Sequence, residues 1–285
     1  MQRREFFRAA AMTTGMAVIA GEVPAAGSAS STDLSKPKDY STEPFKRLVI
    51  MGESTVQGGG WLEHPDKERY ADILATLIGE CQGAPIEYFN KGIGANAISP
   101  RSPGYEKSAK PSALERYKSD VIELRPDLFI LAYGLNDMRA AMPIADFRED
   151  MATIIRDVKQ ACSPVTVLTT VYYMTGWKSF PPYDKGSVGL TLKYNNAVRG
   201  LAKEFDCIVA DLWGAEGGAD WLIHYDGVHA NKVGNLVIGH RIFEALAQHA
   251  SGMTNTTFTR TQETQWTHGA MELRAKAGDP FKKTW

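Results

Sequence analysis

Residues 46–61 read KRLVIMGESTVQGGGW, and this stretch decides how the rest of the chain folds. The apolar run 48–51 predicts a buried strand, which breaks at Gly52 into Glu53, Ser54 and Thr55. Ser54 therefore follows the carboxyl end of the predicted strand, and open α/β sheets bind ligands at that edge. A serine in this place is a candidate nucleophile if another part of the chain can activate it.

Strands and helices alternate along the chain from residue 45 onward. The predicted strands cover residues 46–51, 86–90, 127–133, 165–172 and 207–212, and the predicted helices cover residues 68–80, 112–124, 143–161, 192–204 and 231–249. The continuous apolar run 128–133 (LFILAY) is typical of a strand that is covered on both faces. The alternation predicts an α/β fold in which one five-stranded parallel sheet lies between two helical layers, a three-layer α/β/α sandwich.

The two ends of the chain lie outside this predicted domain. Arg3 and Arg4 precede two phenylalanines, a weakly apolar run to residue 20 and small residues up to residue 29, a pattern typical of a twin-arginine (Tat) export signal. The apolar run is too short and too interrupted for a stable membrane span. We therefore expect a Tat signal over residues 1–29, a flexible lead-in over 30–44, the domain over 45–250 and a polar tail over 251–285.

This signal predicts a bacterial protein that is periplasmic or secreted, with the Tat translocase as its partner during export. The net charge of −1, from 32 Lys+Arg and 33 Asp+Glu, gives no reason to expect a nucleic acid partner. Cys81, Cys162 and Cys207 are far apart and form no CxxC pair, which favours buried small side chains over metal or redox chemistry. We expect no metal and no cofactor.

Three further stretches follow predicted strands at the same edge as Ser54. They are residues 90–96 (NKGIGAN), 134–137 (GLND) and 226–229 (DGVH). Each is weak alone, since a glycine after a strand is usually a turn and a pair such as Asn136 and Asp137 is usually a helix N-cap. In this order, each at the carboxyl end of a strand, they predict one shared site.

With these blocks the chain resembles the SGNH hydrolases, also called GDSL-type esterases and lipases. The matching blocks are GES at 52–54, the glycine-rich turn at 92–96, GLND at 134–137 and DGVH at 226–229, and the resemblance covers residues 45–249. It implies a flavodoxin-like sheet with strand order 2-1-3-4-5 and serine esterase chemistry. It also implies an oxyanion hole formed by the backbone N–H of Ser54, a backbone N–H of Gly94 or Ala95, and the side-chain amide of Asn136.

The residue types fit the same chemistry. A serine hydroxyl is a poor nucleophile until a base takes its proton. His229 is the candidate base, and Asp226, three residues earlier, can accept a hydrogen bond from its Nδ1–H, so that Nε2 faces Ser54. We therefore expect Ser54, His229 and Asp226 to be the catalytic residues.

Two positions depart from the family's usual pattern. Glu53 stands where the family usually has Asp, and its extra methylene can shift the local hydrogen bonds. Ala95 stands where the family usually has Gly, and Ala is strained if the position needs a positive φ. Which N–H of Gly94 and Ala95 faces the oxyanion stays open.

The substrate is less well defined by the sequence. Trp61, Trp177 and Tyr183 are candidates for an aromatic wall against a sugar ring or an acyl chain, although ordinary loop packing explains them equally well. No stretch resembles a long apolar lid, which argues against triglycerides. Together with the predicted export, this favours a carbohydrate O-acetylesterase that acts on small-molecule or glycan esters with short acyl groups.

Three alternatives remain at this stage. A lysophospholipase or a thioesterase-type lipase would differ only in the shape of its pocket. A non-catalytic glycan-binding module on the same fold would be expected to have lost one of the three catalytic residue types. A metal cluster at His224, Asp226 and His229 has no further ligand apparent elsewhere and leaves the blocks around Ser54 and Asn136 unexplained.

Overall fold

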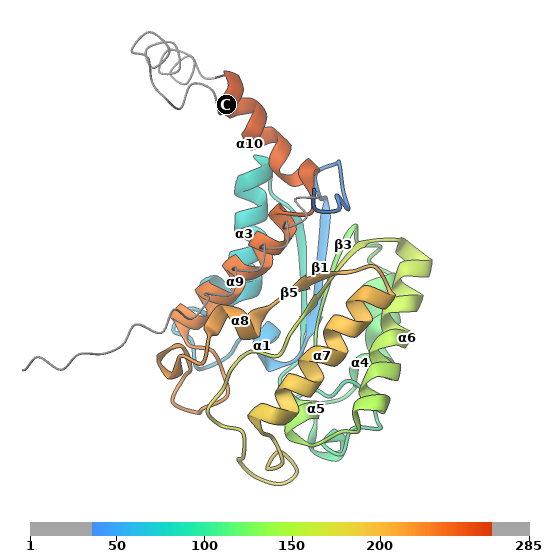
Figure 1. Cartoon of the computed structure of the whole chain (residues 1–285), viewed down its shortest axis with the longest axis vertical. Coiled ribbons are helices and arrows are strands. Elements are labelled where there is room, and N and C mark those ends of the chain that lie inside the picture. The colour runs from blue at the N-terminus through green and yellow to red at the C-terminus, as the bar shows by residue number, and fades with distance from the viewer. Residues whose placement is uncertain (1–35, 264–285) are drawn as a thin grey trace, which may run out of the picture. The chain divides into compact units, whose positions relative to one another are not determined.

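Five strands form one parallel sheet at the centre of the fold (Figure 1). The computed structural model describes residues 36–263. The strand order is β2-β1-β3-β4-β5, and each neighbouring pair is parallel. The strands are β1 (Arg47–Gly52), β2 (Glu87–Gly92), β3 (Leu128–Ala132), β4 (Val165–Thr169) and β5 (Ile208–Ala210). The predicted sheet and its order 2-1-3-4-5 are confirmed.

Two helical layers cover this sheet (Figure 1). On one face α3 (Tyr70–Gln82) packs against α9 (Lys232–Ala247), and on the other α6 (Ile144–Cys162) packs against α7 (Val188–Glu204). The shorter elements are α1 (Ser54–Gln57), α2 (Pro65–Glu68), η1 (Tyr105–Lys107), α4 (Ala113–Tyr117), the π-helical turn η2 (Lys118–Ile122), α5 (Leu135–Arg139), α8 (Leu212–Glu216), η3 (Asp220–Leu222) and α10 (Ser251–Glu263). The predicted three-layer α/β/α architecture is confirmed.

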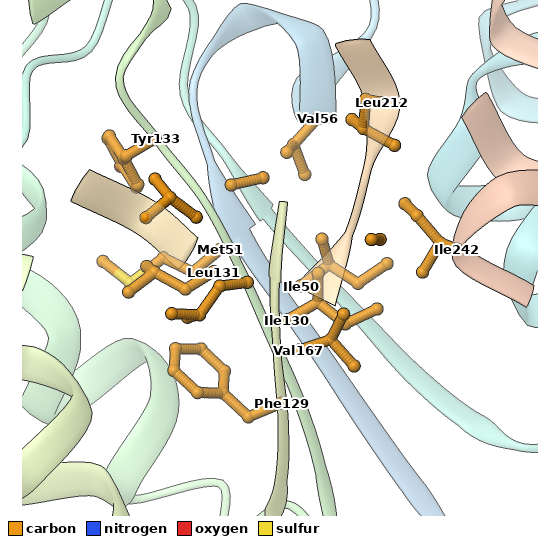
Figure 2. Packing of buried hydrophobic residues seen from close by; sticks show 14 of the residues in the cluster. Ile50, Met51, Val56, Phe129, Ile130, Leu131, Tyr133, Val167, Leu212 and Ile242 are labelled. Carbon is orange, nitrogen blue, oxygen red and sulfur yellow. The ribbon is translucent and has the colours of Figure 1, made fainter. Parts of the chain in front are cut away.

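The central strands are buried on both faces. Ile50 and Ile130 lie side by side in the sheet register and point toward Ile242 of α9, whereas Met51 and Leu131 point to the opposite side (Figure 2). All five side chains are fully buried. Each such side chain contributes about 1.5–3 kcal/mol of hydrophobic stabilisation. A shift of one residue would exchange the two faces, so this packing fixes the strand register and the position of the strand ends.

The last two strands are shorter than the sequence predicts. β4 ends at Thr169 instead of residue 172, and β5 ends at Ala210 instead of residue 212. For β5 the physical reason is Asp211, whose side chain accepts the N–H of Gly214 and caps α8. The chain therefore turns into a helix where we expected the strand to continue.

Two helices also differ from their predicted bounds. α7 begins at Val188, four residues before the predicted start, because the Ser187 hydroxyl caps it by accepting the N–H of Leu190. The predicted helix 112–124 is divided into α4 and η2. α1, α5 and α8 were not predicted, because four or five residues are too few to show a helical period.

The predicted signal (1–29), the first part of the lead-in (30–35) and the last part of the tail (264–285) lie outside the described residues. Within the lead-in, the Tyr40 N–H donates to the His249 carbonyl at 2.7 Å, and the Asp39 carboxylate accepts the N–H of Ser251 at 3.0 Å. These bonds hold the lead-in against the start of α10. Of the helices between residues 36 and 263, none has the length and apolar character that a membrane span requires.

Candidate active site

β1 and α1 place Ser54 at the carboxyl edge of the sheet. The strand ends at Gly52, Glu53 is the N-cap residue, and Ser54 is the first residue of α1. Only glycine fits at position 52, since a Cβ there would lie 2.2 Å from Cγ2 of Val56 and 2.7 Å from the Ala132 carbonyl oxygen. The backbone N–H of a first helical residue has no acceptor within its helix. That of Ser54 donates to no group within residues 36–263.

Hydrogen bonds connect Ser54, His229 and Asp226 in one chain. The Ser54 Oγ lies 2.9 Å from His229 Nε2, and His229 Nδ1 lies 2.7 Å from Asp226 Oδ2. The other carboxylate oxygen of Asp226 accepts the backbone N–H groups of Val228 at 2.8 Å and His229 at 3.0 Å. The structure therefore brings together the three residues that the sequence nominated as catalytic.

The electrostatic surroundings suit a neutral imidazole beside a charged carboxylate. Burial lowers the pKa of His229, and the charges of Arg139 and His224 add to this effect, whereas the hydrogen bond to Asp226 opposes it. Burial raises the pKa of Asp226, but hydrogen bonds from the His229 side chain and from two backbone N–H groups outweigh it and hold that pKa well below its ordinary value. His229 can therefore accept a proton near neutral pH.

The predicted oxyanion residues lie on the same pocket as Ser54. One N–H of the Asn136 side chain donates to the Asn96 carbonyl at 3.0 Å, which fixes the orientation of the amide. The backbone N–H groups of Gly94 and Ala95 donate to no acceptor in the described part of the chain. Both backbone candidates are therefore available to a ligand.

Ala95 has the backbone conformation that the sequence flagged. Its φ is +52°, in the left-handed region that glycine adopts without strain. For a residue with a Cβ, this conformation costs about 1–2 kcal/mol. The expected strain at Ala95 is therefore present.

Glu53 connects the nucleophile turn with the start of α5. Its carboxylate is 1% exposed and accepts the backbone N–H groups of Gly134, Leu135 and Asn136 at 3.1, 2.9 and 3.0 Å. Burial and the charge of Asp137 raise the pKa of Glu53 to about 8, although the three N–H groups oppose this. The Glu53 side chain, one methylene longer than Asp, therefore reaches from the end of β1 to the start of α5, which follows β3.

The prediction that Asn136 or Asp137 caps the following helix is wrong. Both residues lie inside α5, whose N-cap residue is Gly134. Asp137 instead accepts the N–H of Ile98 with both carboxylate oxygens, at 3.2 Å each. The physical reason is Glu53, which follows β1. Its carboxylate accepts the N-terminal N–H groups of α5, so that no local side chain is needed to cap this helix.

The Ser54 pocket has a volume of about 630 Å³. Its lining residues are Ser54, Gln57, Gly58, Gly59, Trp61, Gly94, Ala95, Asn136, Arg139, Ser179, Phe180, Tyr183, Asp226, Val228 and His229. Two of the three predicted wall residues, Trp61 and Tyr183, are among them. Trp177 is not, and this part of the prediction requires correction, because its ring packs against Tyr173 and Trp213.

Trp61 also contacts the catalytic candidate His229. The two rings are stacked, with their centroids 3.7 Å apart and their planes within 10° of parallel. Gly59 also lies close to this indole ring, since a Cβ on Gly59 would lie 2.4 Å from it. Trp61 therefore covers one face of the imidazole as well as lining the pocket.

Arg139 and Ser179 are pocket residues that the sequence analysis missed, whereas Phe180 belongs to the same aromatic loop as the predicted wall residues Trp177 and Tyr183 and also lines the pocket. The signal for Arg139 was its spacing, because residues three apart on a helix share a face and Asn136 is three residues earlier. Ser179 and Phe180 lie in the loop before α7, whose path the sequence does not determine. Within residues 36–263, no group of three or more His, Cys, Asp or Glu side chains is arranged to hold a metal ion.

The fold is similar to that of several solved structures. A lipase/acylhydrolase from Enterococcus faecalis superposes with a TM-score of 0.57 at 20% identity, over 70% of this chain and 95% of that one. A carbohydrate acetylesterase from Sinorhizobium meliloti gives 0.58 at 16% identity, over 71% and 98%. An acetylxylan esterase from Geobacillus stearothermophilus gives 0.56 at 17% identity, over 72% and 95%.

At these identities the likeness concerns the fold alone. A comparison with curated protein sequences gives no match. The sequence profile of the GDSL-like lipase/acylhydrolase family matches residues 50–237, which include Ser54, Asn136, Asp226 and His229. The chain therefore belongs to the GDSL-like lipase/acylhydrolase family and is a carboxylic ester hydrolase.

Proposed function

We propose that this hydrolase is a serine esterase in which Ser54 is the nucleophile, His229 the general base and Asp226 the residue that orients His229. The observation that carries the proposal is the continuous chain of contacts from Ser54 Oγ to His229 Nε2 at 2.9 Å and from His229 Nδ1 to Asp226 Oδ2 at 2.7 Å. The lowered pKa of His229 supports it, because a base must be neutral before it can take the serine proton.

In the proposed reaction, Ser54 Oγ attacks the ester carbonyl carbon while its proton passes to His229 Nε2. The tetrahedral intermediate collapses when His229 returns this proton to the departing alcohol, which leaves an acyl group on Ser54. Water then attacks the acyl carbon, His229 takes one proton from it, and the carboxylic acid leaves as the proton returns to Ser54.

The negative oxygen of each intermediate needs hydrogen-bond donors. We assign this role to the N–H of Ser54, the free N–H of the Asn136 amide, and the N–H of Gly94 or Ala95. All of these groups border the same pocket. One such donor typically contributes about 3–4 kcal/mol to the stability of the transition state.

For the substrate we propose a carbohydrate ester with a short acyl group, such as an O-acetylated sugar. Trp61, Phe180 and Tyr183 border the pocket, and aromatic rings suit the faces of sugar rings. Two proteins of the same fold are described as a carbohydrate acetylesterase and an acetylxylan esterase, which is consistent with this substrate class.

The direct test compares hydrolysis of p-nitrophenyl acetate, butyrate and octanoate by the wild type and by Ser54→Ala. We expect Ser54→Ala to lose activity by a factor on the order of 10⁴ or more, and acetate to be the preferred acyl group. Ser119→Ala, at an exposed serine within η2, is the matched control and should retain wild-type rates. Equal activity of Ser54→Ala and the wild type would exclude Ser54, and a preference for octanoate would exclude the acetylesterase.

We also propose that residues 1–29 direct export through the Tat pathway, so that the enzyme acts in the periplasm or outside the cell. The proposal is supported by Arg3 and Arg4 ahead of the apolar run. Cell fractionation of a bacterial host tests it, since replacement of both arginines by lysine should retain the protein in the cytoplasm. Undiminished export of that variant would show that the Tat translocase does not recognise the arginine pair.

A further inference from the structure

Arg139 brings a buried positive charge to the Ser54 pocket. It is the last residue of α5, one helical turn after Asn136, and only 6% of it is exposed. It borders the pocket together with Ser54, His229 and Ser179. The proposed reaction gives this side chain no role.

Most of the hydrogen-bonding capacity of this guanidinium is unused. A guanidinium carries five N–H donors. Nη2 of Arg139 donates to the Ser179 hydroxyl at 2.7 Å, whereas Nε is buried without any partner. Nη1 has no acceptor among the described residues, and no carboxylate of residues 36–259 forms an ion pair with Arg139.

A second buried arginine of the chain shows what a satisfied guanidinium looks like here. Arg116 is 4% exposed, and its Nη1 forms an ion pair with Asp120 at 2.6 Å. Its Nη2 donates to backbone carbonyls and to the Tyr133 hydroxyl. Arg116 therefore has a counter-ion within the protein, although its Nε is also unpartnered, and Arg139 has none.

The two carboxylates whose charges act on Arg139 are committed to other groups. Glu53 and Asp226 both affect the pKa of Arg139, which burial lowers and these two charges raise. However, the Glu53 carboxylate accepts three backbone N–H groups and the Asp226 carboxylate holds His229. Neither carboxylate contacts the guanidinium of Arg139.

Anchoring of the neighbouring loop does not account for this arrangement. Arg139 contacts the loop before α7 through the Ser179 hydroxyl, through the Tyr183 ring, whose centroid lies 5.7 Å from Cζ, and through its own carbonyl, which accepts the N–H of Lys185 at 3.0 Å. A neutral hydrogen-bonding side chain could make the first contact and any residue the last, and the neutral ring of Tyr183 attracts the cation without being a counter-ion. Burial of a cation without a counter-ion costs more free energy than one neutral hydrogen bond returns.

We infer that Arg139 and Ser179 form an anion-binding subsite of the Ser54 pocket, which takes a carboxylate carried by the ester substrate. The inference rests on the proposed serine esterase and narrows its substrate from acylated sugars in general to acylated sugar acids. A carboxylate matches a guanidinium geometrically, because both are planar and can form two parallel hydrogen bonds. The carboxylate of the substrate would then be the counter-ion that Arg139 lacks within the protein.

Two matched substrate pairs test for this charge on either side of the ester bond. O-acetylated galacturonic acid and O-acetylated galactose differ only by the carboxylate on the alcohol part. Mono-p-nitrophenyl glutarate and p-nitrophenyl valerate differ only by the carboxylate on the acyl part. At low ionic strength, we expect O-acetylated galacturonic acid to have a kcat/KM at least about ten-fold higher than O-acetylated galactose in the wild type, mainly through a lower KM, and the glutarate pair to show no such preference.

Variants then assign this preference to Arg139. Arg139→Met should reduce the charged-to-neutral ratio toward one, and Arg139→Lys should keep part of it because lysine retains the charge without the planar donor set. The control is Arg148→Met, at an arginine of α6 that pairs with Glu204 at 2.8 Å and lies outside the pocket lining. This control should keep the wild-type ratio.

A ratio near one for the galacturonic acid pair in the wild type, a preference confined to the glutarate pair, or a ratio that Arg139→Met leaves unchanged would overturn the inference. If Arg139→Met does not fold, calorimetry of the wild type with free galacturonate and free galactose gives the same decision, since only galacturonate should bind. This binding does not depend on Ser54. Activity that survives in Ser54→Ala would therefore refute the proposed esterase mechanism while the titration still tests Arg139.

Discussion

Ala95 carries a backbone conformation that its side chain opposes. Because its φ is +52°, the change Ala95→Gly should remove the strain, while the greater freedom of glycine in the unfolded chain offsets part of the gain. We expect the free energy of unfolding to stay equal or to rise by up to about 1 kcal/mol. The N–H remains in place, so the esterase rate should be retained.

Ala95→Val tests the same argument from the other side. A β-branched residue in the left-handed region is a strong outlier, so this variant should lose more than about 1 kcal/mol of stability. Urea unfolding of the three proteins measures both effects. A valine variant as stable as the wild type would show that the turn 92–96 relaxes to another conformation and that φ at this position is not constrained.

Trp61 should hold the imidazole of His229 in the orientation that faces Ser54. Trp61→Leu removes the stacked ring, whose centroid lies 3.7 Å from that of His229, and we expect kcat for p-nitrophenyl acetate to fall about ten-fold. Trp61→Phe should keep most of the rate, because it retains an aromatic face against the imidazole.

Gly59→Ala perturbs the same contact without replacing either ring. Its Cβ would lie 2.4 Å from the indole, so the ring must move. The rate should fall as in Trp61→Leu, and the double variant should be no slower than the slower single variant. Fully additive losses would mean that Gly59 acts on the pocket by another route.

For single residues, the sequence could identify those whose partners are near in the sequence or belong to a motif of the family. Asp226 and His229 lie three residues apart, and this spacing alone sets their contact. Arg139 could not be assessed in the same way. Its significance lies in the acceptors that it lacks, and these depend on how distant loops and strands surround it.

Between elements, Glu53 acts as a bridge from the end of β1 to the first turn of α5. Glu53→Ala would leave three buried N–H groups without an acceptor, and we expect a loss of about 2–4 kcal/mol in the free energy of unfolding. kcat should fall as well, because Asn136 lies in the turn that Glu53 holds. Urea unfolding and p-nitrophenyl acetate hydrolysis measure the two effects.

Glu53→Gln provides the matched comparison, since its amide oxygen can still accept N–H groups. This variant should recover part of both losses, and Glu123→Gln at an exposed glutamate should change neither. If Glu53→Ala were as stable and as active as the wild type, α5 would not depend on this bridge.

The prediction of helices and strands succeeded where the residues of a single element are enough to identify it. The apolar runs of β1 and β3 are long enough to identify buried strands. α5 is too short to show a helical period, and no local capping residue marks its start, because its N-terminal N–H groups find their acceptor in Glu53, more than 80 positions earlier in the chain. β5 is shorter than predicted for a related reason. The Asp211 side chain caps α8 directly after the strand, and the apolar residues alone do not predict this helix.

At the scale of the whole fold, the buried carboxylate of Glu216 finds no hydrogen-bond partner among residues 36–263. Glu216, at the end of α8, is 3% exposed, and neither of its carboxylate oxygens has a hydrogen-bond partner. It lies near the start of α9, where a Cβ on Gly234 would be 3.3 Å from Oε1. Burial alone raises the pKa of Glu216 from 4.5 to about 8.

This shift makes global stability depend on pH in a definite direction. The folded protein holds the proton on Glu216 up to about pH 8, whereas the unfolded chain releases it near pH 4.5. The stability associated with this proton is therefore complete below pH 4.5 and is lost as the pH rises to 8. A shift of this size corresponds to a loss of up to about 5 kcal/mol.

Glu216→Gln removes the titration while it keeps the size and shape of the side chain. Its free energy of unfolding should match that of the wild type near pH 4.5 and exceed it increasingly up to pH 8, with a constant difference above that. The measurement is urea unfolding of both proteins across this range, with Glu123→Gln as the exposed control. Glu53 contributes equally to both proteins and so cancels in the comparison. A difference that does not change with pH would mean that water or a shift of α8 satisfies the carboxylate, and that its burial does not oppose ionisation.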